Sequence, residues 1–154
     1  MRPILRYVRG GCVRKPGMAG SLQMTTELRY LVAAAILTLL IRVPWMVNKV
    51  TVRGLEKVSA YPLTSEPLSQ WAHRVWVAHQ DAVQNLVVFA VLVVALDAAG
   101  ETNAWTRGAA ILYFWARVVH FLVYAFGIPR VKTVAFLASF AAQLVLAWQL
   151  LVLM

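Results

Sequence analysis

The residues that could do chemistry gather in two stretches of an otherwise apolar chain. The first is 74–85, RVWVAHQDAVQN, which holds an arginine, a histidine, an aspartate, glutamines and an asparagine. Hydrocarbon offers such groups no partners, so we expect them to face protein, water or a ligand. At helical spacing, Arg74, Asp81 and Asn85 share one stripe, and Gln84 lies on a second stripe about a third of a turn away. His79 lies apart from both stripes.

The second stretch places four polar or aromatic side chains on one helix face, because they are spaced by three or four residues. These are Tyr113, Arg117, His120 and Tyr124. Arg117 lies too far from either end of its apolar segment to reach the headgroups easily. An unpaired arginine at that depth costs roughly 2.5–3.5 kcal/mol on insertion scales. We therefore predict that Arg117 or Arg74 pairs with Asp81 in a closed interior.

Two matched polar stripes favour a site for a polar, anionic ligand, although a simpler interpretation exists. A buried Arg–Asp pair surrounded by amides can hold helices together without binding anything. His79 and His120 can likewise be ordinary interior histidines. With one carboxylate nearby and no HxxxH spacing, no metal site is predicted. The chain shows no Ser/His/Asp or Cys/His nucleophile and no glycine-rich phosphate loop.

Composition shows which elements must position these residues. The 154 residues are 61% hydrophobic and only 14% charged, with a mean hydropathy of +0.69. A soluble domain of this length carries more charge, so we expect an integral membrane protein with lipid as its surroundings. Four apolar stretches, at about 28–47, 69–97, 104–126 and 131–153, predict transmembrane helices. A polar connection at 48–70 and short turns at 100–103 and 127–130 predict an all-α, up-down four-helix bundle formed by residues 24–154.

The formal charge of +9 is concentrated before Met24. The five basic residues of that leader are Arg2, Arg6, Arg9, Arg14 and Lys15. From Met24 onward, ten Lys and Arg oppose six Asp and Glu. We predict no nucleic-acid partner, because a chain buried in lipid has no broad basic face. The single cysteine, Cys12, also lies in the leader and excludes a disulfide within the chain.

Loop charges predict the orientation of the bundle. The connection after the first helix and the turn after the third carry Lys49, Arg53, Lys57, Arg130 and Lys132. Both connections lie on one side, which we expect to be cytoplasmic. Residues 1–23 would add basic residues to the opposite side. We therefore favour translation from Met24 over a basic tail at the membrane surface.

The first helix carries two irregular features. Arg42 interrupts its apolar run near one end, and we expect this arginine to reach the headgroups rather than to form part of a site. Pro44 is predicted to kink or end the helix nearby. Spans rich in alanine and valine, without targeting signals, favour a bacterial inner membrane. In a eukaryote we would expect a membrane of the endoplasmic-reticulum type.

The two polar stretches resemble motifs of the MAPEG family, the membrane-associated proteins in eicosanoid and glutathione metabolism, which includes the microsomal glutathione transferases. Residues 74–89, RVWVAHQDAVQNLVVF, are similar to the family pattern RxxRAHxNxxEN followed by apolar residues. Residues 116–129, ARVVHFLVYAFGIP, are similar to ARxxHxxxYxxxxP. The second match is the more specific, because arginine, histidine, tyrosine and proline all keep their spacing. The resemblance covers about residues 28–153.

The resemblance implies a homotrimer that binds glutathione as co-substrate between neighbouring subunits and uses no metal. It implies glutathione-dependent transferase or peroxidase chemistry on lipophilic electrophiles that partition into the bilayer. The residues carried over as glutathione ligands are Arg74, His79, Asp81, Gln84, Arg117, His120 and Tyr124. In the family a cation near the start of the fourth helix activates the thiol, and Lys132 is the nearest match, with Arg130 as the alternative. Tyr124 would donate a hydrogen bond to the reacting group.

Three positions depart from the family pattern. Val77 stands where the family has a second arginine, Asp81 where it has an asparagine, and Gln84 where it has a glutamate. Loss of an arginine should weaken the grip on a carboxylate, because its bidentate fork is hard to replace. These departures support an alternative function, a relative without transferase chemistry that binds a lipid or a partner protein. A small transporter has less support, because no broken helices or internal repeats are present.

Overall fold

The structure is a computed structural model that describes residues 24–59 and 67–154, and all of its elements there are helices. They are α1 (Thr26–Arg53), α2 (Leu55–Ser59), α3 (Gln70–Ala99), α4 (Ala104–Phe126) and α5 (Pro129–Leu153). α1, α3, α4 and α5 are long and apolar enough to cross a membrane, which confirms the four predicted spans. The expectation about residues 1–23 lies outside the described residues.

The predicted end of the first helix was wrong. α1 does not stop near Val47 but continues past Pro44 to Arg53, and α2 follows within the stretch 48–70 that was expected to be a polar connection. The residues after Pro44 remain helical because they pack on α3: Trp45 stacks on Trp76, and the Asn48 amide donates to the Ser69 hydroxyl at 3.1 Å. A proline in a membrane helix is tolerated where neighbouring helices support the backbone.

The other helix ends follow recognisable capping signals. Asn103 caps α4 through a capping box with Thr106, and Gly100 and Gly127 end α3 and α4 in the left-handed conformation. α5 begins two residues before the predicted start, with Pro129 in its first turn, where a missing N–H is harmless. Short turns therefore join α3 to α4 and α4 to α5.

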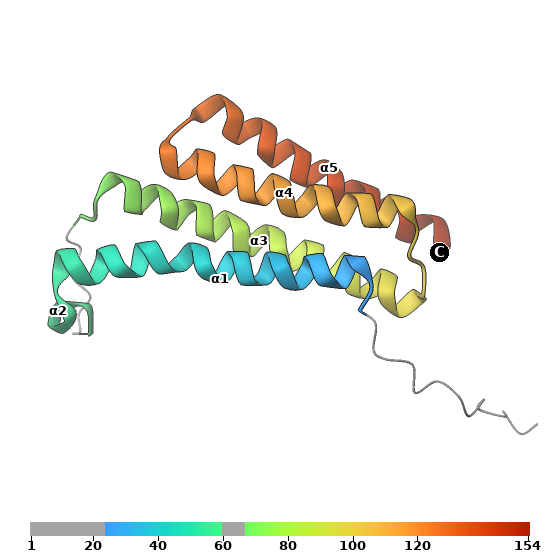
Figure 1. Ribbon diagram of the computed structural model, residues 1–154, viewed down its shortest axis with the longest axis horizontal. Helices are drawn as coiled ribbons and strands as arrows, with labels where there is room; N and C mark the ends of the chain where they lie inside the picture. Colours follow the sequence, from blue (N-terminus) through green and yellow to red (C-terminus); the bar gives the residue numbers. More distant parts are fainter. Residues whose placement is uncertain (1–23, 60–66) are drawn as a thin grey trace, which may run out of the picture.

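The four long helices form two pairs that lie against each other (Figure 1). α1 runs beside α3, and α4 forms a hairpin with α5, while α4 also contacts α1 and α3. The carboxyl ends of α1 and α4 and the amino ends of α3 and α5 share one end of the bundle (Figure 1). This end, called here the basic end, carries the predicted cytoplasmic charges.

Small residues and one aromatic stack form the core. Ala34, Ala110 and Ala142 are buried at helix contacts, where small side chains let backbones approach closely. Phe89 of α3 and Tyr113 of α4 stack with ring centroids 3.8 Å apart, and both are almost fully buried. Tyr113 therefore belongs to the packing between helices, and it lies one helical turn before Arg117 in α4.

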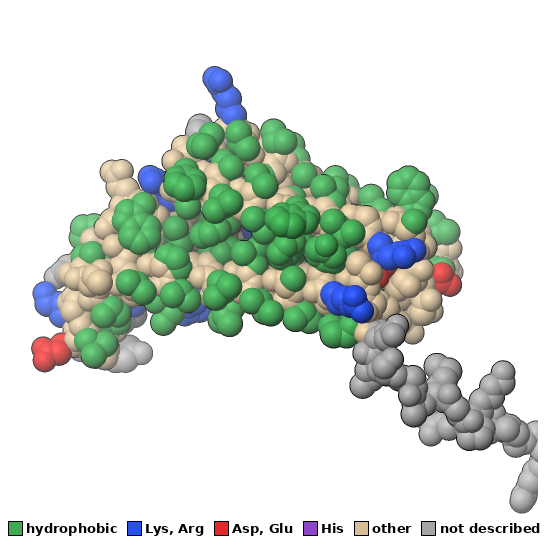
Figure 2. Space-filling model, viewed as in Figure 1, with side chains coloured by type: hydrophobic (Ala, Val, Ile, Leu, Met, Phe, Trp, Pro, Cys, Tyr) green, Lys and Arg blue, Asp and Glu red, His purple; other side chains and the backbone are tan. Residues whose placement is uncertain are grey.

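The outer surface is apolar, as a lipid environment requires. Figure 2 shows hydrophobic side chains over much of the visible face, with charged side chains mainly toward the ends of the helices. Leu39, Val91 and Val134 are among the exposed aliphatic residues on three different helices. The chain is thus an integral, multi-pass membrane protein that presents an apolar surface to the bilayer.

Polar contacts at the end opposite the basic end tie the helices together. The buried Glu27 carboxylate of α1 accepts a hydrogen bond from the Thr106 hydroxyl of α4. The Asn103 amide donates to Gln149 of α5 at 3.0 Å. These contacts join α1 to α4 and the start of α4 to the last turns of α5, and they fix the register of the bundle.

Candidate functional site

A buried ion pair between α3 and α4 is the centre of the candidate site. Arg117 Nη1 donates to Asp81 Oδ2 at 2.8 Å, and the Arg117 side chain is only 5% exposed. Of the two predicted partners for Asp81, the structure shows Arg117. The Asp81 side chain is 27% exposed, so the carboxylate faces outward on one side. The pair neutralises two charges that neither helix could carry alone in lipid.

Amide groups extend this pair toward α5. Asn85 Nδ2 donates to Asp81 Oδ1 at 3.2 Å and also to the Asp81 backbone carbonyl at 2.8 Å. Gln143 of α5 donates from its Nε2 to the Asn85 carbonyl at 2.9 Å. Polar groups from α3, α4 and α5 therefore form one connected network, which holds the Asp81 carboxylate in a fixed position.

The exposed side of Asp81 opens into a groove of about 250 Å³. Its lining residues come from α3, α4 and α5 and are Val77, Asp81, His120, Tyr124, Lys132, Thr133 and Phe136. His120 is buried, and its Nδ1 lies 3.8 Å from Asp81 Oδ2, without a hydrogen bond to any described residue. The Lys132 ammonium lies 4.7 Å from the centroid of the Tyr124 ring. The groove thus combines a carboxylate, a cation, an imidazole and a phenol.

A second hollow of about 200 Å³ continues this groove toward the basic end, since Tyr124 and Lys132 line both. Arg74 lines the second hollow and donates from Nε to the Ala125 carbonyl at 3.3 Å. Gly127 has a φ of 77° and would place a Cβ 3.6 Å from the Arg74 guanidinium carbon. The glycine therefore supplies the turn, and the guanidinium packs over it. We call the two hollows together the α3–α5 groove.

The structure brings most of the predicted site residues together. Arg74, Asp81, His120, Tyr124 and Lys132 line the α3–α5 groove, and Arg117 lies directly behind Asp81. Three other predicted residues lie elsewhere in the single chain. They are His79, Gln84 and Arg130.

His79 faces α1 and not the groove. Its Nδ1 lies 3.2 Å from the Thr38 carbonyl, and its ring packs near Trp76. Gln84 is exposed on α3. It lies two helical turns after Val77 and on the same side of the helix. Arg130 is exposed at the start of α5 and does not line the groove, so Lys132 is the cation placed beside Tyr124.

The sequence reasoning missed the contribution of α5 beyond Lys132. Thr133 and Phe136 line the groove, and Gln143 holds Asn85. Phe136 follows Lys132 by one helical turn, which places both on one face. Gln143 is a buried amide in a nearly uninterrupted apolar helix, and an isolated polar residue in such a helix is a usable sequence signal.

A four-helix membrane bundle with a buried Arg–Asp pair opening into a groove defines the class of this protein. The comparison with family models matches the MAPEG family over residues 30–152. The match covers most of the chain, so the protein belongs to the MAPEG family, whose members act in glutathione and eicosanoid metabolism. No curated protein matches the chain.

Proposed function

We propose that the protein is a glutathione-dependent transferase or peroxidase that acts on lipophilic electrophiles dissolved in the bilayer. The observation that carries the proposal is the α3–α5 groove, in which Lys132 lines the same hollow as Asp81 and Arg74 lines the adjoining hollow. Glutathione has two carboxylates and one ammonium group, so a site with two cations and one carboxylate matches its charges. The His120 ring lines the same groove, with its Nδ1 buried 3.8 Å from Asp81 Oδ2.

Lys132 is the residue proposed to activate the thiol. A cation beside a thiol lowers the pKa of that thiol and raises the fraction present as thiolate, which is the nucleophile. The thiolate sulfur would form a bond to the electrophilic carbon while the leaving group departs with its electron pair. The Tyr124 phenol lies beside Lys132 and would donate a hydrogen bond to the sulfur.

The proposed site lies between subunits of a homotrimer. Gln84 stands midway along α3, where hydrocarbon would surround an exposed amide. An amide that faces lipid without a partner is costly, so a neighbouring subunit over this face would remove the cost. The trimer is tested by native mass spectrometry of the protein released from mild detergent, with the expectation of a mass three times the 17.2 kDa of one chain.

The catalytic proposal is tested by conjugation of a chlorodinitrobenzene-type electrophile with and without glutathione. We expect thiol-dependent turnover that falls about tenfold or more in Lys132→Met, as for other residues that stabilise a developing anion. Arg130→Met removes a cation two residues away that does not line the groove, and it should keep the activity. Absence of thiol-dependent turnover in the intact protein would contradict the proposal.

A second candidate function is binding of a lipid or partner protein without thiol chemistry. The observation that favours it is Val77, which lines the groove at the position where the family pattern has an arginine. Glutathione binding without turnover, or lipid binding in its place, would select this candidate. Val77→Arg adds a cation beside Asp81 and should raise the affinity for glutathione in equilibrium dialysis, with Leu55→Arg on the exposed α2, outside the four spans, as the control.

A further inference from the structure

The basic end of the bundle has a projecting part formed by α1 and α3, with the short α2 beside the end of α1. At 1.5 Å per residue, α1 and α3 are about 42 and 45 Å long, against about 35 and 38 Å for α4 and α5. Figure 1 shows α1 and α3 extending past the α4–α5 hairpin at this end. A hydrocarbon core of about 30 Å does not cover helices of that length. We therefore place the projecting part at the depth of the headgroup layer.

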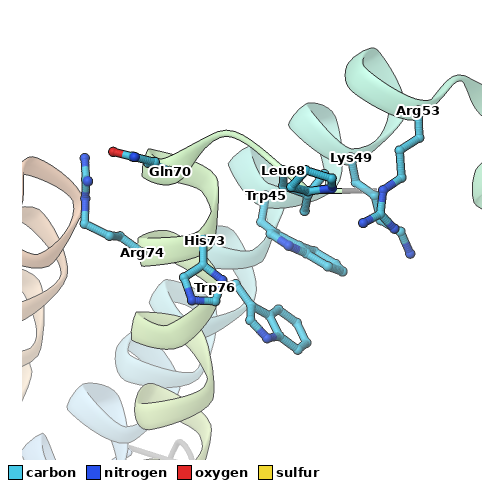
Figure 3. Close-up of a pocket in the computed structure, with 9 residues that line it drawn as sticks. Trp45, Lys49, Arg53, Leu68, Gln70, His73, Arg74 and Trp76 are labelled. Carbon is cyan, nitrogen blue, oxygen red and sulfur yellow. The ribbon is translucent and has the colours of Figure 1, made fainter. Parts of the chain in front are cut away.

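A pocket of about 640 Å³ lies on this projecting part. Figure 3 shows its labelled side chains, which come from α1, from α3 and from the residues just before α3. Trp45 and Trp76 form its aromatic side, with ring centroids 4.4 Å apart and planes inclined by 26°. Indoles of this kind favour the boundary between headgroups and hydrocarbon, because one part is apolar and the N–H can bond to water.

The polar side of the pocket is basic. Lys49 and Arg53 reach it from α1, and His73 reaches it from α3 (Figure 3). The Lys49 ammonium lies 5.3 Å from the centroid of the Trp45 ring, which holds it at the pocket. No Asp or Glu is among the described residues that line the pocket. Arg74 also lines it but points away toward α4, where it contacts the Ala125 carbonyl (Figure 3).

We propose that this pocket binds the headgroup of an anionic phospholipid. Its phosphate would lie against Lys49, and its glycerol and first acyl carbons would lie on the Trp45–Trp76 pair. A lipid fits better than a soluble anion, because the pocket has one basic and one aromatic side and stands at headgroup depth. The pocket is separate from the α3–α5 groove apart from Arg74, so the inference does not depend on glutathione chemistry.

The test is native mass spectrometry of the full chain in detergent, titrated with phosphatidylglycerol or with phosphatidylcholine of the same acyl chains. One surface cation near an anionic lipid is worth about a fivefold preference. We therefore expect at least about fivefold tighter binding of phosphatidylglycerol, and loss of most of that preference in Lys49→Gln. Lys49→Arg keeps the charge and should keep the preference. Arg29→Gln removes a charge from the opposite end of the same helix and serves as the matched control.

Three outcomes would overturn the inference. The first is equal binding of the two lipids by the intact protein. The second is an unchanged preference in Lys49→Gln, since charge complementarity at this pocket would then have no effect. The third is release of phosphatidylglycerol by millimolar inorganic phosphate, which would mean that a soluble phosphate and not a lipid occupies the pocket.

Discussion

The Arg117–Asp81 pair gives a quantitative prediction, because its two members are buried to different extents. Asp81→Leu leaves an arginine that is 5% exposed without its anion, and we expect a loss of about 3 kcal/mol or more in the free energy of unfolding. Arg117→Met leaves a carboxylate that is 27% exposed and keeps its bond from Asn85. The free energy of unfolding should fall less in this variant, by about 2 kcal/mol, because water can reach the unpaired carboxylate.

The double variant Asp81→Leu with Arg117→Met removes both charges and places two apolar side chains in contact where the ion pair was. Replacement of a buried ion pair by apolar residues of similar size is often nearly neutral, so we expect a total loss of no more than about 2 kcal/mol rather than the additive value of about 5 kcal/mol. Asn85 is not stranded in either background, since its amide still donates to the backbone carbonyl of residue 81. The measurement is reversible unfolding in mixed micelles with increasing dodecyl sulfate, followed by tryptophan fluorescence.

Two results would refute this reasoning. Additive losses in the double variant would show that the two side chains do not stabilise each other. A larger loss for Arg117→Met than for Asp81→Leu would show that burial does not set the cost of the stranded charge. Glutathione dialysis on the double variant separates stability from binding, because a folded double variant without glutathione affinity would assign the pair a role in the ligand site.

The remaining predictions concern the packing around the site, and each is measured by the same unfolding assay. Gly127→Ala forces a side chain into a left-handed backbone conformation and should cost about 1–2 kcal/mol, while Gly127→Asn should cost less. Phe89→Ala removes one ring of the buried stack with Tyr113 and should cost about 3–5 kcal/mol, whereas Val91→Ala on the exposed face should change stability by less than about 0.5 kcal/mol. Gln143→Leu should cost less than about 1 kcal/mol, because the Asn85 carbonyl keeps its helical hydrogen bond. A loss of several kcal/mol in Gln143→Leu would instead show that α5 is held mainly through this amide.

The four spans could be predicted well from the sequence, because the length and the apolar character of a membrane helix depend on that helix alone. Apolar length set the four spans, and the spacing of Tyr113, Arg117, His120 and Tyr124 placed them on one face. The ion-pair partner of Asp81 could be predicted to be one of two arginines, since a buried carboxylate needs a cation. The choice of Arg117 required the relative rotation of α3 and α4, which no single helix encodes.

The structure differs from, or adds to, the sequence-based predictions where contacts between helices decide the outcome. Pro44 is locally unfavourable in a helix, but the packing of Trp45 and Asn48 on α3 carries α1 onward to Arg53. His79 faces α1 because its rotation around α3 differs from that of Asp81, and the motif alone does not show which helix stands opposite. The same limit hid the contribution of Phe136, since its position on one face of α5 matters only once α5 packs against α4.

The origin of the α3–α5 groove from three helices has a consequence for how the site forms. Short turns join α3 to α4 and α4 to α5, so each of these neighbours can pair soon after insertion, whereas the lining of the groove comes from all three helices. The α3–α5 groove is therefore absent until α5, the last of the three in the chain, packs against α3 as well as α4. Ligand affinity thus reports on the last step of folding, and a compound that occupies the groove would act as a pharmacological chaperone for destabilised variants.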